Sequence, residues 1–117
     1  MKTILIVEDV ELNIDLLTQL LEDEYSLLVA KDGATGVAMA DEKRPDLVIM
    51  DIALPVMDGY EATRRIREKY PSMPIIGLSS HAMPGDAEKA RAAGCNDYLT
   101  KPIDEDVLLG TLKQHLG

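Results

Sequence analysis

The chain has 117 residues, a common size for a single domain, and we expect residues 1–117 to fold around one core. Its 12 Lys and Arg against 21 Asp and Glu give a net charge of −9 without a dense basic cluster, which argues against binding to nucleic acid or an anionic membrane. The single Cys cannot form an internal disulfide, which fits a reducing compartment. No apolar stretch approaches ~20 residues, and the first apolar run begins almost at the first residue, which leaves no room for a signal peptide. We therefore expect a cytoplasmic protein.

Short apolar runs alternate with segments of helical spacing along the chain. In order, we predict a strand at 3–7, a helix at 12–21, a strand at 26–30, a helix at 34–42, a strand at 47–50, a helix at 58–69, a strand at 74–78, a helix at 84–93, a strand at 97–100 and a helix at 104–116. Three aspartates are predicted helix N-caps, and Glu61 follows one of them in capping-box register: Asp32, Asp58 and Asp104.

Five strands alternating with five helices predict a parallel sheet joined by right-handed crossovers. The continuously apolar run at 47–50 is typical of a strand that is covered on both faces. Dinucleotide-binding sheets normally have six strands, so five strands favour the other doubly wound arrangement. We therefore predict an α/β, flavodoxin-like (βα)5 fold with a five-stranded parallel sheet in the order 2-1-3-4-5.

Polar residues that could bind a ligand or take part in a reaction stand where four of these strands end. The carboxyl ends of parallel strands share one edge of a sheet, and open α/β sheets bind ligands there. Carboxylates suit a magnesium ion, and a hydroxyl and an ammonium suit a phosphoryl group. Each residue alone is explained as the start of a loop, whereas the set on adjacent strands predicts one site: Glu8, Asp9, Asp51, Ser79 and Lys101.

Four segments of the chain carry a family resemblance: ILIVEDVELN, VIMDIALPVMDGYEATRRIR, PIIGLSSHAM and DYLTKPI. Together they resemble the receiver domain of bacterial response regulators, over essentially the full length. Among receivers, the stretch YEATRRIR and the ELN after the acidic pair are most similar to those of hybrid histidine kinases and of stand-alone regulators. The resemblance implies a single receiver domain over 1–117 with no effector domain.

The resemblance also implies a role for each site residue. Asp51 would be the phosphoacceptor, Lys101 would neutralise phosphoryl oxygens, and Ser79 would be the switch hydroxyl. Tyr98 would be the switch aromatic, and the peptide bond Lys101–Pro102 would be cis. The cofactor would be Mg²⁺, with Mn²⁺ as a substitute, held by four groups: the side chains of Glu8, Asp9 and Asp51, and the backbone carbonyl of Ala53.

The partners that the resemblance implies are proteins. A histidine kinase or a histidine phosphotransfer protein would donate the phosphoryl group, and a downstream protein would receive the signal. The chain would be a regulatory phosphoacceptor that catalyses only its own phosphorylation and dephosphorylation, as a monomer or a weak phosphorylation-dependent dimer. Kinase helices would dock near Asn13, Pro102 and Ile103. Ala53 cannot orient a water molecule, so we hypothesise slow self-hydrolysis unless His81 assists.

Two other functions fit the same fold class. A haloacid-dehalogenase-like aspartyl phosphatase would also place an aspartate such as Asp51 after a strand, although such enzymes have a second Asp where this chain has Ala53. A flavin- or nucleotide-binding module is the other alternative, but the chain lacks a G-x-x-x-x-G-K-[ST] motif. Outside the site, we interpret Cys95 as a buried filler and the basic stretch from Arg64 to Lys69 as a solvated helix face.

Overall fold

A computed structural model describes residues 1–54, 57–79 and 85–117 of the chain. Strands and helices alternate along it as the sequence predicts. They are β1 (Thr3–Val7), α1 (Glu11–Leu21), β2 (Ser26–Ala30), α2 (Gly33–Lys43), β3 (Leu47–Asp51), α3 (Gly59–Lys69), β4 (Ile75–Ser79), α4 (Asp86–Ala93), β5 (Asp97–Thr100) and α5 (Glu105–Leu116).

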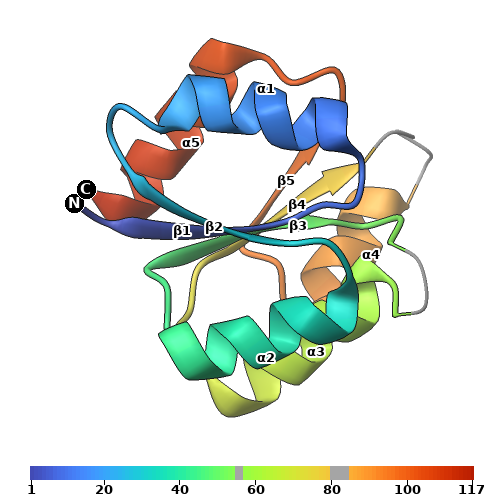
Figure 1. Ribbon diagram of the computed structural model, residues 1–117. Helices are drawn as coiled ribbons and strands as arrows, with labels where there is room; N and C mark the ends of the chain where they lie inside the picture. The colour runs from blue at the N-terminus through green and yellow to red at the C-terminus, as the bar shows by residue number, and fades with distance from the viewer. Residues whose placement is uncertain (55–56, 80–84) are drawn as a thin grey trace.

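The five strands form one parallel sheet in the order β2-β1-β3-β4-β5, which confirms the predicted flavodoxin-like topology. Helices α1 and α5 cover one face of the sheet, and α2, α3 and α4 cover the other (Figure 1). The third strand runs one residue further than predicted, and the fourth is shifted by one residue, from 74–78 to Ile75–Ser79, because Asp51 and Ser79 pair within the sheet instead of following it. Both side chains are therefore held by strand geometry and not by a loop.

Two apolar clusters, one on each face of the sheet, form the core. The cluster under α2, α3 and α4 contains buried residues from β1, β2, β3 and β4, together with Cys95, whose predicted role as a buried filler is confirmed. The cluster under α1 and α5 consists of Ile and Leu residues. Since parallel sheets in α/β proteins are covered on both faces, their central strands are apolar throughout, and all five residues of β3 are buried. The site can therefore lie only at the ends of the strands.

The predicted aspartate caps begin three of the helices. The side chain of Asp32 accepts a hydrogen bond from the Thr35 amide, and the side chain of Asp104 accepts one from the Val107 amide. Asp58 accepts the amide hydrogen of Glu61 at 2.9 Å and so begins α3 close to the end of β3. Each cap fixes the direction in which the chain leaves the sheet edge.

The interpretation of the basic stretch as a solvated face is wrong for Arg67. Its Nε and Nη2 donate hydrogen bonds to the Gly94 carbonyl at 3.1 and 2.6 Å, and Nη2 also donates to Asn96 Oδ1 at 2.7 Å. Its Nη1 donates to the carbonyls of Tyr70 and Pro71 at 3.2 and 2.7 Å. Partial burial lowers the pKa of the guanidinium. Arg67 thus fastens the end of α3 to the segment between α4 and β5.

Within residues 1–54, 57–79 and 85–117, no helix is long and apolar enough to cross a membrane. The longest helix, α5, has 12 residues. A transmembrane helix needs about 20 predominantly apolar residues.

Candidate phosphoryl and metal site

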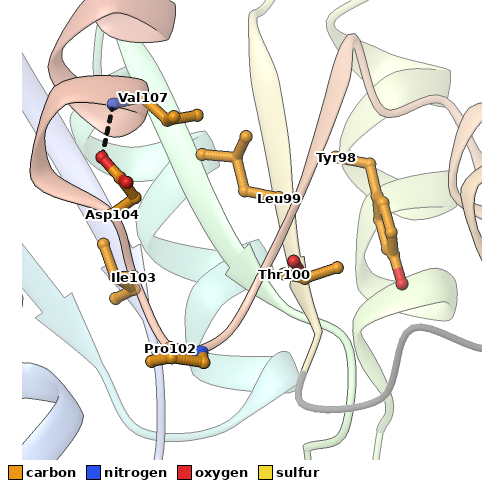
Figure 2. A pocket seen from close by; sticks show the side chains of 7 residues that line it. All are labelled: Tyr98, Leu99, Thr100, Pro102, Ile103, Asp104 and Val107. Atoms are coloured by element: carbon orange, nitrogen blue, oxygen red, sulfur yellow. Dashed lines mark hydrogen bonds between the residues drawn. The ribbon is translucent and has the colours of Figure 1, made fainter.

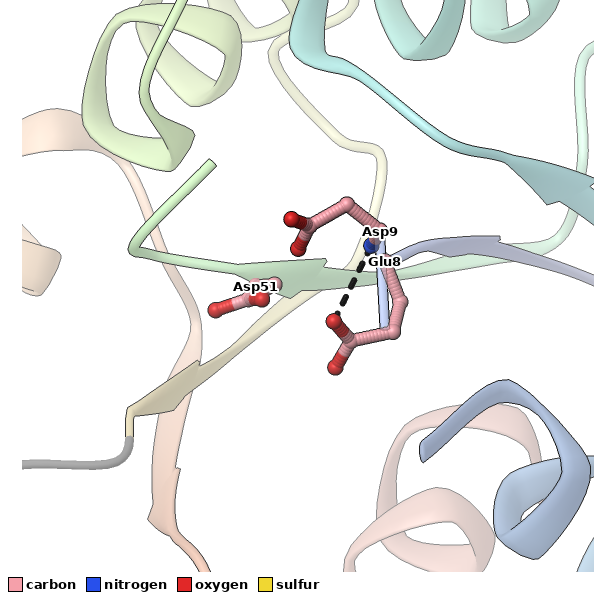
Figure 3. A group of neighbouring side chains, drawn as sticks. All are labelled: Glu8, Asp9 and Asp51. Carbon is pink, nitrogen blue, oxygen red and sulfur yellow. Dashed lines mark hydrogen bonds between the residues drawn. The ribbon is translucent and has the colours of Figure 1, made fainter. Parts of the chain in front are cut away.

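Three carboxylates meet at the carboxyl end of the two central strands. Glu8 and Asp9 directly follow β1, and Asp51 is the last residue of the neighbouring strand β3. One oxygen from each of the three side chains lies within 4.8 Å of the others. Figure 3 shows the three carboxylates converging from two strands. The predicted acidic cluster is therefore present in the folded chain.

Glu8 is the most buried member of the cluster, with 1% of its surface exposed. Its Oε2 accepts hydrogen bonds from the backbone amides of Asp9 at 3.0 Å and Val10 at 3.1 Å. Its Oε1 accepts a hydrogen bond from Lys101 Nζ at 2.8 Å. Because both oxygens have partners, the Glu8 carboxylate is held in one orientation. The exposed Asp9 offers the more accessible carboxylate.

Asp51 occupies the centre of the site and is 3% exposed. Its Oδ1 accepts a hydrogen bond from the Ala53 amide at 3.1 Å, so the chain turns sharply as it leaves β3. The turn brings Gly59, at the start of α3, against the end of the strand. A Cβ atom at Gly59 would lie 2.1 Å from the carbonyl oxygen of Asp51. Only glycine permits this approach, a constraint that sequence reasoning missed although the Asp58–Gly59 pair at a helix start signalled it.

Lys101 reaches this centre from the end of β5. Its Nζ lies 2.8 Å from Glu8 Oε1 and 3.5 Å from Asp51 Oδ2, and 12% of its side chain is exposed. The following peptide bond, Lys101–Pro102, is cis, as the resemblance implied. In a partly dry cleft, the ammonium offsets the mutual repulsion of the carboxylates.

Ser79 and Tyr98 lie on the same side of the two neighbouring strands. Ser79 ends β4, is 7% exposed and pairs in register with Thr100. Tyr98 pairs with Gly77, and its half-buried side chain packs against the cluster under α3 and α4. Figure 2 shows the Tyr98 ring on the opposite side of β5 from Leu99, which lines a pocket with residues of the loop before α5 and of α5 itself. The two predicted switch residues are thus neighbours on one face.

The donor set fits a magnesium ion. Carboxylate oxygens are the ligands this hard cation prefers, and three of them converge within reach of one ion. Lys101 and two backbone amides engage Glu8, so Asp9 and Asp51 present the less encumbered oxygens. The carbonyl of Ala53 stays a predicted fourth ligand. The hypothesis for His81 concerns a residue outside the described part of the chain, and it stays a prediction.

A further pair of polar residues, at the opposite end of β5, was not expected. His115 lies in the last turn of α5, where a histidine suits the helix C-terminus. Its Nε2 lies 2.6 Å from Oδ2 of Asp97, the first residue of β5. The pair joins the end of α5 to the edge strand. Its two members are 18 residues apart, so the local sequence gave no signal of the contact.

Comparisons with known proteins agree with this geometry. The family model described as the response regulator receiver domain matches residues 4–113. The polar-differentiation response regulator DivK of Brucella anthropi is 38% identical over 119 residues, which cover 99% of this chain and 97% of DivK.

Solved structures give the same result. The receiver domain of the sensor histidine kinase PA1611 from Pseudomonas aeruginosa, with a magnesium ion coordinated in its active site cleft, is 38% identical, with a TM-score of 0.90 and coverage of 97% of this chain and 96% of that chain. The chemotaxis protein CheY4 of Vibrio cholerae is 31% identical, with a TM-score of 0.92 and 99% coverage of both chains.

Proposed function

The chain belongs to the response regulator receiver domain family, and from this premise we propose that Asp51 accepts a phosphoryl group from a histidine kinase or a histidine phosphotransfer protein. The observation that carries the proposal is the buried Asp51 carboxylate, with Lys101 on one side and two further carboxylates beside it. The family match favours this function over an aspartyl phosphatase or a flavin-binding module. The chain is a regulatory phosphoacceptor, and we propose that it catalyses only its own phosphorylation and dephosphorylation.

The reaction requires an attack by one carboxylate oxygen of Asp51. That oxygen forms an O–P bond as the N–P bond of the donor phosphohistidine breaks, and the released imidazole takes up a proton. Asp51 Oδ1 is held by the Ala53 amide, and this bond fixes the plane of the carboxylate during the approach of the donor. Such transfers depend mainly on positioning and on neutralisation of the equatorial oxygens.

Side chains of this site would supply both metal binding and charge. Glu8, Asp9 and Asp51, with the Ala53 carbonyl, would hold Mg²⁺, which supplies charge neutralisation on the phosphoryl oxygens when bound. Lys101 already lies 3.5 Å from Asp51 Oδ2, so its ammonium needs only a short movement to reach a phosphoryl oxygen. Glu8 keeps the ammonium close to the acceptor before the reaction.

Phosphorylation would then be read by Ser79 and Tyr98. A phosphoryl group adds strong acceptor oxygens, and the Ser79 hydroxyl gains a hydrogen bond by moving towards them. Tyr98 stands on the same face of the adjacent strand and would turn inward as Ser79 moves. This repacking would alter the surface formed by α4, β5 and α5, through which a downstream protein would sense phosphorylation.

The surface near the site suits a helical phosphoryl donor. Three apolar side chains project into solvent on or just before α1, which begins two residues after Asp9: Val10 is 45%, Leu12 79% and Leu16 40% exposed. Such side chains commonly mark a protein contact when they gather at a functional edge. The predicted contacts at Asn13, Pro102 and Ile103 remain part of this proposal.

A small-molecule phosphodonor tests the function. We expect acetyl phosphate with Mg²⁺ to add one phosphoryl group to the protein, detected by intact mass, and hydroxylamine to remove it because an acyl phosphate is labile. Asp51→Asn should show no adduct. Asp58→Asn is a matched control, because Asp58 is a helix cap outside the carboxylate cluster. Absence of the adduct on the wild type, or its persistence in Asp51→Asn, would contradict the proposal.

A further inference from the structure

The start of α2 lies against the backbone of the segment that leads from the phosphoacceptor strand into α3. Gly33 is the first residue of α2 and is buried. A Cβ atom at Gly33 would lie 2.3 Å from the carbonyl oxygen of Met57 and 3.2 Å from its carbonyl carbon. Backbone atoms cannot rotate out of the way as the end of a side chain can, so any larger residue at this position must displace Met57.

This contact is distinct from the packing of α2 on the sheet. Gly36, one turn further along α2, is also buried, and its Cβ atom would meet the two methyl groups of Val7 on β1, each at 2.9 Å. The helix thus meets β1 through a side chain, but it meets Met57 through the main chain. Glycine is a poor helix former, so its presence in the first turn of α2 requires a reason, and the approach of the Met57 carbonyl to Gly33 supplies one.

Met57 is connected to the site by the two residues that follow it, Asp58 and Gly59. The amide of Gly59 donates a hydrogen bond to the Ile52 carbonyl at 3.0 Å. A Cβ atom at Gly59 would lie 2.1 Å from the carbonyl oxygen of Asp51, so this residue is in turn pressed against the end of β3. Helices α2 and α3 lie side by side on one face of the sheet (Figure 1). A displacement of the Met57 carbonyl would therefore be passed to the strand end that carries Asp51.

We infer that Gly33 is a positioning residue for the metal site. Because it has no side chain, it lets the start of α2 support Met57, and through Gly59 the end of β3, in the arrangement that brings the three carboxylates together. The inference rests on the proposed function, which assigns Mg²⁺ to these carboxylates. It adds the turn after β2 to the site, as a support that supplies no ligand.

A substitution that displaces Met57 tests the inference. The affinity for Mg²⁺ is measured by NMR, from the shift of the Asp9 amide during titration with magnesium chloride. Gly33→Ala should raise the dissociation constant about tenfold, as is typical when a group that supports metal ligands is lost. Leu112→Ala is the control, because Leu112 is buried in the cluster under α1 and α5, on the opposite face of the sheet. It should destabilise the fold but leave the dissociation constant close to the wild-type value.

Hydrogen exchange of the wild type gives a second test that needs no substitution. Coupling between two sites is reciprocal, so if the start of α2 supports the metal site, bound Mg²⁺ must stabilise the start of α2. The amides of Thr35 and Gly36 report this, because they donate to the Asp32 side chain at 2.7 Å and to its carbonyl at 3.0 Å. We expect Mg²⁺ to slow their exchange by a larger factor than that of the amides at the equivalent cap of α5, made by Asp104.

The outcomes separate this inference from the proposed function. If the wild type shows no shift on addition of Mg²⁺, the proposed metal site fails and the inference fails with it. If the wild type binds Mg²⁺ but Gly33→Ala binds it equally well, or if Leu112→Ala loses as much affinity, the inference alone is overturned. Circular dichroism shows whether Gly33→Ala is folded. If it is not, the exchange measurement decides, and equal slowing at the two helix caps would overturn the inference. Intact mass after treatment with acetyl phosphate shows independently whether the wild type is a phosphoacceptor.

Discussion

Replacement of Lys101 by Met should expose how strongly the carboxylates of the site depend on its ammonium. The lysine lies 2.8 Å from Glu8 Oε1 and 3.5 Å from Asp51 Oδ2, and these two carboxylate side chains are 1% and 4% exposed. At an effective dielectric constant near 20, the two attractions are worth about 6 and about 5 kcal/mol before desolvation is subtracted. Removing one partner of a buried ion pair typically destabilises a protein by about 3–5 kcal/mol. We expect Lys101→Met to lose a free energy of unfolding in that range.

The assay is urea unfolding followed by circular dichroism, with Lys31→Met as control. Lys31 pairs with Glu11 on the surface, where the two side chains are 64% and 63% exposed, so its loss should change stability little. Both variants remove one positive charge. If Mg²⁺ binds the carboxylates, a concentration of 100 times its dissociation constant should stabilise Lys101→Met by about 2.7 kcal/mol, and the same concentration should stabilise the wild type less. Equal losses in the two variants, without added metal, would refute the reasoning.

Four further predictions concern packing at the site and elsewhere in the fold. Arg67→Ala should lower the free energy of unfolding by about 2–3 kcal/mol in urea unfolding, because carbonyls such as that of Gly94 lose a charged donor. Arg64→Ala, which removes a more exposed arginine of the same helix, is the control. Gly59→Ala should destabilise the chain by about 3 kcal/mol in the same assay and slow adduct formation measured by mass, because its Cβ would overlap backbone at the end of β3. Burial raises the pKa of the Cys95 thiol, so alkylation at pH 8 should be far slower in folded than in urea-unfolded protein. The same shift should make stability fall as pH rises above the unfolded thiol pKa of about 8.5, an effect absent in Cys95→Ala.

The sequence by itself determined the elements and their order in the sheet. Continuous apolar runs such as 47–50 indicated strands covered on both faces, and the caps at Asp58 and Asp104 marked helix starts, because these signals depend on neighbours along the chain. The parallel topology followed from alternation alone. It placed Glu8 and Asp51 at one edge, since the carboxyl ends of adjacent parallel strands must meet.

Only the tertiary structure decided how the groups at that edge divide their contacts. Nothing near Glu8 in sequence indicates that Lys101, 93 residues away, binds it more closely than it binds Asp51. The role of Arg67 was equally hidden, because its partners Gly94 and Asn96 lie 27 and 29 residues away, in the segment between α4 and β5. Gly77 shows the same limit: the side chains that pack against it, Ile52 and Cys95, come from other parts of the chain, so the local sequence does not indicate them.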